Sequence, residues 1–164
     1  MSKETAVKER TRAGPGDDQV MEQHRELRAL AADLREFLRI ERPELGDAAG
    51  TQWASELAAR LLNLHTKLYA HFRHEESSGF MDRLMQRFPR ATHSVESLAK
   101  EHDWMLRDLN AILSAAIVYS EGKRPQNPHL RRWVLSLLDE LNRHEREEND
   151  LFQRLLYEEI GVGD

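Results

Sequence analysis

Residues 57–75 read LAARLLNLHTKLYAHFRHE, and this stretch decides the fold class of the chain. Its leucines recur every three or four residues, which is the spacing of one face of an α-helix. They are Leu57, Leu61, Leu64 and Leu68. The same spacing predicts that residues 71 and 75 also face the protein core, yet these are His71 and Glu75. The predicted helix therefore ends with two polar side chains in buried positions.

Three further segments have apolar residues at the same spacing, so we predict four long helices and no strand. Proline, glycine and capping residues set their ends. The first two run from a cap at Asp17 or Asp18 to RPELGD at 42–47, and from near Thr51 to Pro89 with a weak point or bend at the SSG of 77–79. The last two run from between 90 and 94 to within 121–128, and onward from Asn127–Pro128.

Four amphipathic helices joined by short loops predict an all-α protein, an up-down-up-down four-helix bundle. Residues 1–16 are polar and end in glycine and proline, so we expect a disordered N-terminal tail there. We expect residues 17–160 to form a single four-helix domain.

The composition excludes several classes of protein. The absence of cysteine excludes disulfides, thiolate zinc sites and iron–sulfur clusters. A net charge of −5 without a basic cluster argues against a nucleic-acid partner. The chain shows no secretory signal and no apolar run of membrane length, so we expect a cytoplasmic protein with no membrane partner.

Each predicted helix has polar residues where its apolar spacing requires buried ones. These residues are His24 in the first helix, His71 and Glu75 in the second, His102 in the third, and His144 and Glu148 in the fourth. In each helix these residues lie about 16 to 20 residues, or roughly 24–30 Å, from the loop at the far end. We therefore expect all six side chains to lie in one layer of the bundle. Buried carboxylates are costly unless they are paired, protonated or bound to a cation.

Histidine and glutamate four residues apart point in nearly the same direction from a helix. His71 with Glu75 and His144 with Glu148 have this spacing. Imidazole and carboxylate ligands without sulfur suit iron or manganese, with zinc also possible. Two glutamates on facing helices can bridge two ions and leave two histidines for each, so the sequence predicts a pair of divalent ions.

In this order and register, the residues resemble the hemerythrin-like family, also called the HHE cation-binding domain. The pattern reads His24, HFRHE at 71–75, His102 and HEREE at 144–148. The resemblance implies a non-haem diiron centre (two Fe ions) that meets dioxygen, peroxide or nitric oxide. It further implies that Glu75 and Glu148 bridge the irons, that His24 and His71 bind one iron, and that His102 and His144 bind the other.

The sequence departs from the oxygen-carrying members of the family at Leu106, where they have a further histidine one turn after the third-helix ligand. One iron would then have an open position, which favours peroxide or oxygen chemistry over simple oxygen carriage. His74 could replace the missing ligand, but a solvated or supporting role is favoured. We expect Glu76, Glu145 and Glu147 at the surface, although Glu76 or Glu147 could hydrogen-bond a ligand histidine.

Two functions stay open at this point. One is an enzyme that consumes peroxide or acts as an oxidase, and the alternative is a non-catalytic module for sensing, oxygen carriage or iron buffering. A metal-free interaction bundle is a third and weaker hypothesis. The sequence does not identify a protein partner or an oligomeric state.

Overall fold

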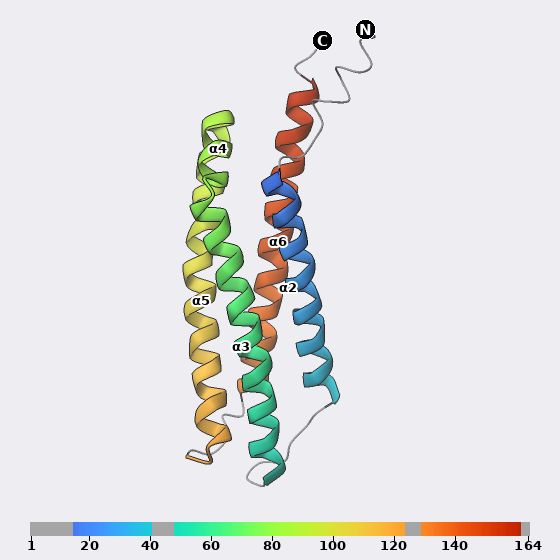
Figure 1. The fold of residues 1–164 in the computed structure, drawn as a ribbon, viewed down its shortest axis with the longest axis vertical. Helices are drawn as coiled ribbons and strands as arrows, with labels where there is room; N and C mark the ends of the chain where they lie inside the picture. The colour runs from blue at the N-terminus through green and yellow to red at the C-terminus, as the bar shows by residue number, and fades with distance from the viewer. Residues whose placement is uncertain (1–14, 41–47, 124–128, 162–164) are drawn as a thin grey trace.

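The computed structural model in Figure 1 describes residues 15–40, 48–123 and 129–161. These residues contain five α-helices, one short 3-10 helix and no strand, which confirms the all-α prediction. The elements are α2 (Pro15–Ile40), α3 (Ala48–Ser77), α4 (Phe80–Arg87), η1 (Pro89–Ala91), α5 (Thr92–Ser120) and α6 (Leu130–Gly161). Most of the predicted tail, the RPELGD loop and the Asn127–Pro128 cap lie outside the described residues.

The described helix boundaries lie within a few residues of the predicted ones, except at the break within the predicted second helix. α5 begins at Thr92, inside the predicted window, whereas α2 begins at Pro15, before the predicted aspartate cap. Proline is tolerated in the first turn of a helix, where no intrahelical partner is needed for its missing N–H. No described helix has the length and hydropathy of a membrane span.

The predicted second helix is two helices rather than one bent helix. α3 ends at Ser77, and α4 begins after Gly79, which has a φ of 70°. Glycine adopts this left-handed conformation without steric cost, so the SSG sequence ends the helix outright. Pro89 then opens η1, the short connection into α5.

Two hydrophobic clusters fill the interior, and the predicted polar layer lies between them. The larger cluster contains the leucine face of α3 together with side chains from α2, α5 and α6. The smaller cluster contains Met81, Ala91, Val95, Leu98, Leu151 and Leu155. Along α5 the order is Leu98, His102, Met105, so apolar side chains close the polar layer on both sides.

The four long helices lie side by side along the length of the molecule (Figure 1). α3 contacts both α2 and α5, and α6 contacts both α5 and α2. Each long helix thus faces the interior and can contribute a side chain to the polar layer.

Candidate metal centre

All six predicted ligands meet in one buried layer. His24 comes from α2, His71 and Glu75 from α3, His102 from α5, and His144 and Glu148 from α6. Each side chain is at most 1% exposed. The apolar spacing of the helices dictates this arrangement, because every ligand continues a buried face that leucine occupies elsewhere.

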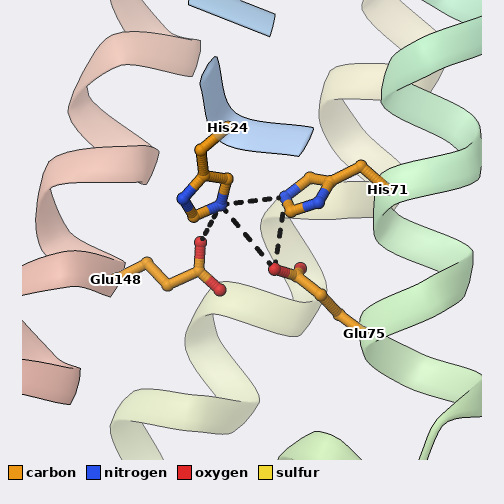
Figure 2. A group of neighbouring side chains, drawn as sticks. All are labelled: His24, His71, Glu75 and Glu148. Carbon is orange, nitrogen blue, oxygen red and sulfur yellow. Dashed lines mark hydrogen bonds and ion pairs between the residues drawn. The ribbon is translucent and has the colours of Figure 1, made fainter. Parts of the chain in front are cut away.

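One half of the centre is formed by His24, His71 and the two glutamates (Figure 2). The Nε2 atoms of His24 and His71 lie 3.1 Å apart. His24 Nε2 is 3.0 Å from Glu148 Oε2, and His71 Nε2 is 3.2 Å from Glu75 Oε1. One ligand atom from each of the four residues lies within 4.8 Å of all the others, so this group could hold a metal ion.

The other half is formed by His102 and His144, whose ring centroids lie 5.0 Å apart. Glu75 reaches this half as well, because its second oxygen, Oε2, lies 3.4 Å from His102 Nε2. Phe72 stacks on the His102 ring at 3.9 Å and excludes solvent from that side. Glu75 is therefore placed to join the two halves through its two oxygens.

The atoms that face the middle of the layer lack hydrogen bonds in the described part of the chain. They are both carboxylate oxygens of Glu75 and of Glu148, and Nε2 of His102 and His144. The short histidine–glutamate distances are thus close approaches without hydrogen-bond geometry. Orphaned buried atoms of this kind are costly unless something else binds them, and nitrogen and oxygen donors in this number fit metal cations.

The charge states of two histidines suit a cation, whereas Glu75 would have to release a proton to bind one. Burial and the neighbouring histidines lower the pKa of His71 to about 3, and the same causes lower the pKa of His102 to about 3. Both rings are therefore neutral and can donate a lone pair. Burial and the charge of Glu148 raise the pKa of Glu75 to about 11. Burial acts to raise the pKa of Glu148 too, but the close approach of His24 and of the protonated Glu75 outweighs it and lowers that pKa to about 2.

Polar side chains from neighbouring helices support three of the four histidines at Nδ1. His71 Nδ1 lies 3.2 Å from Gln23 Oε1. His102 Nδ1 lies 3.1 Å from Glu76 Oε1, and His144 Nδ1 lies 3.0 Å from Glu101 Oε2. The prediction that Glu76 could bond a ligand histidine is confirmed, whereas Glu147 is exposed and pairs with Arg143. Sequence reasoning missed Gln23 and Glu101.

Three other predictions have different outcomes. The prediction that Glu145 lies at the surface is wrong, because it is 4% exposed and paired with Arg28 at 3.2 Å. Leu106 packs against the larger hydrophobic cluster, as suits an apolar residue in place of a ligand. His74 is partly buried and lies outside the group of four residues identified above, so its role as an extra ligand stays a prediction.

Among the comparisons with known proteins, the comparison with protein families agrees with this geometry. The family model described as the hemerythrin HHE cation-binding domain matches residues 16–156, a span that includes all six predicted ligands. No curated protein and no solved structure matches the chain.

Proposed function

Because the chain belongs to the hemerythrin HHE cation-binding domain family, we propose that it is a non-haem diiron protein that binds and handles dioxygen, peroxide or nitric oxide. The observation that carries this proposal is the set of buried carboxylate oxygens and imidazole nitrogens without hydrogen bonds at the centre of the layer. A metal-free interaction bundle gives no reason to bury these atoms unsatisfied.

The proposed ligand set assigns Glu75 and Glu148 as bridges between two ions. His24 and His71 would hold one ion, and His102 and His144 would hold the other. The two oxygens of Glu75 approach histidines of different halves, at 3.2 and 3.4 Å, which supports its bridging role. We propose iron, with manganese or zinc as less favoured ions, because the family and the nitrogen–oxygen ligands favour it.

We also propose the up-down-up-down bundle as the arrangement of the long helices. In Figure 1 the colour gradient reverses direction from α2 to α3, from α5 to α6, and between α3 and α5, which supports this arrangement. This arrangement would bring the ligand residues of all four helices to one level of the bundle. Cytoplasmic location, and the absence of nucleic-acid and membrane partners, stay predictions from the sequence.

Bound iron would supply an open coordination position and a change of oxidation state, which are what dioxygen, peroxide and nitric oxide require. The protein residues hold, orient and isolate that position. Phe72 and the two hydrophobic clusters exclude water, and the neutral histidines donate without first losing a proton. Leu106 gives the His102–His144 half no further ligand, which favours an enzyme over a reversible oxygen carrier.

The test is to purify the protein with iron, measure the metal per chain, and record absorption spectra under air, nitric oxide and peroxide. The proposal expects about two irons per chain and spectra that change with these ligands. Steady loss of peroxide would identify an enzyme, whereas a stable, reversible oxygen adduct would identify the alternative binding module. Failure to retain iron in the wild-type protein would contradict the proposal.

Glu148→Gln is the matched variant for this test, because it keeps the shape of a buried ligand and removes its charge. Glu96→Gln is the control, since Glu96 is exposed on α5 and makes the same change of charge away from the centre. The proposal expects Glu148→Gln to lose iron and Glu96→Gln to retain it. Equal iron content in the two variants would contradict the assignment of Glu148 as a ligand.

A further inference from the structure

The two halves of the proposed centre differ in what supports their histidines at Nδ1. In one half, both histidines direct Nδ1 at a carboxylate oxygen. Glu76 lies 3.1 Å from His102, and Glu101 lies 3.0 Å from His144. Each glutamate lies on a different helix from the histidine that it contacts, so each of these histidines is held by a contact between two helices.

The other half lacks a carboxylate in this position. His71 Nδ1 faces the amide oxygen of Gln23 at 3.2 Å, and His24 Nδ1 has no hydrogen-bond partner among the described side chains. Glu145 is buried and lies near His24. Its Oε2 accepts a hydrogen bond from Arg28 Nη1, and its Oε1 has no hydrogen-bond partner among the described residues.

This difference has a chemical consequence for metal binding. An ionised carboxylate only accepts hydrogen bonds, so it holds the proton on Nδ1 and leaves the lone pair of Nε2 directed at the centre. It also makes the imidazole a stronger donor to a cation. An amide can present either its oxygen or its NH₂ group, so Gln23 neither fixes the tautomer of His71 nor adds negative charge.

We infer that the two halves hold their ions unequally, with the tighter ion at His102 and His144. Glu76 and Glu101 are the positioning residues that set this difference. The inference rests on the proposed two-ion centre and adds to it an order of binding. Loss of such a supporting partner typically weakens metal affinity by about 10–100-fold, so the two binding steps should differ by a factor in that range.

Zinc is a suitable probe, because it is divalent and has no redox chemistry. The full-length apoprotein is titrated with Zn²⁺ against a competing chelator, which resolves two binding constants. Glu101→Gln keeps an acceptor for His144 but removes the charge, so it should weaken the tighter step by about tenfold or more and leave the weaker step unchanged. Gln23→Glu supplies the missing carboxylate and should strengthen the weaker step.

Matched controls separate these effects from a general change of charge or of folding. Glu96→Gln removes the same charge from an exposed position on α5, and Gln19→Glu adds the same charge to an exposed position on α2. Neither control should change either binding constant by more than a few-fold. Far-ultraviolet circular dichroism of each apoprotein establishes that the variants are folded, and a gain of affinity in Gln23→Glu cannot arise from misfolding.

Two ligand variants assign each step to a half of the centre. His144→Ala should remove the tighter step, and His24→Ala should remove the weaker one. Equal affinities in the wild-type protein, or the opposite assignment of the two steps, would overturn the inference while the two-ion centre stands. Binding of fewer than two ions by the wild-type protein would overturn the proposed centre and this inference together.

Discussion

The His24–His71 half and the His102–His144 half have nearly the same inner geometry. In each half the two imidazole rings meet edge to face at an interplanar angle of 72°, with centroids 4.7 and 5.0 Å apart. The outer contacts differ. Gln23 precedes His24 and supports His71, and Glu101 precedes His102 and supports His144, so the same local position carries an amide in one half and a carboxylate in the other.

This comparison separates two levels of information in each helix. The apolar spacing fixes which side chains face the centre. The residue one position along is rotated by about 100° and faces the neighbouring helix, where it can bond the back of another ligand. Conversion of one residue at that second position can therefore change how firmly an ion is held without any change in the ligands themselves.

Substitution of Glu75 should have the largest effect, because it removes what the two halves share. Glu75→Gln is expected to abolish tight binding of both ions, since Glu75 approaches a histidine of each half. The apoprotein should not lose stability, because glutamine is neutral and burial already raises the pKa of Glu75 to about 11. Zinc titration and thermal unfolding of the apoprotein test these two expectations.

Glu75→Gln would contradict the shared role of Glu75 if it weakened ion binding in only one half of the centre. A protein with Glu75→Gln that still bound one ion with wild-type affinity would show that Glu75 belongs to a single half. In that case His24→Ala and His144→Ala, combined with Glu75→Gln, would identify the half that survives.

The next effect is the pH dependence of metal binding. Glu75 keeps its proton at neutral pH because its pKa is raised to about 11, so a metal ion must displace that proton. Affinity should rise by up to about tenfold per pH unit between pH 7 and 9 for each proton released. Calorimetric titration with zinc in two buffers of different ionisation enthalpy counts the protons. Release of no proton would contradict this account.

Both halves of the centre should contribute to the loss of apoprotein stability at low pH. His71 and His102, one from each half, have a folded pKa of about 3 against an ordinary value of 6.5. Their neutral forms are favoured by the fold, so stability is full above about pH 6.5 and falls as the pH drops toward 3. The loss is expected to reach about 2–4 kcal/mol per histidine. Urea unfolding of wild type, His71→Gln and His102→Gln across this range measures it, and equal reductions in acid sensitivity are expected.

The sequence predicts the ligand residues better than it predicts the residues that hydrogen-bond to them. His71 and Glu75 can be predicted because they interrupt a run of leucines, and the same holds for the ligands of the other helices. Gln23 and Glu101 lie off the buried faces, where polar residues are ordinary, so their contacts depend on which helix lies alongside. Glu145 belongs to an acidic run that reads as a solvated face, and only the packing of α6 against α2 buries it.

The sequence predicts a bend after Ser77 rather than the end of a helix, for a related reason. Serine and glycine weaken a helix by propensity, but whether the chain bends or stops depends on the conformation that Gly79 adopts. Its φ of 70° is compatible with a turn and incompatible with a continuous helix. Helix propensity alone does not predict that conformation, which directs α4 into contact with both α3 and α5.

The smallest predicted effect is that of Arg28→Met, which should reduce the difference in zinc affinity between the two halves. Arg28 Nη1 donates to Glu145 Oε2 at 3.2 Å, and Glu145 Oε1 and His24 Nδ1 both lack partners in the described part of the chain. In Arg28→Met, Glu145 is free to accept the Nδ1–H of His24, so the weaker zinc step should strengthen by about two- to fivefold, a fraction of the usual effect of a full partner. The free energy of unfolding of the apoprotein should fall by about 1 kcal/mol, because Arg28 is half-exposed and solvent already screens the pair.

Arg35→Met is the matched control, since Arg35 lies on the same helix and pairs with Asp139. A weaker zinc step that is unchanged in Arg28→Met would show that Glu145 cannot replace the carboxylate that this half lacks.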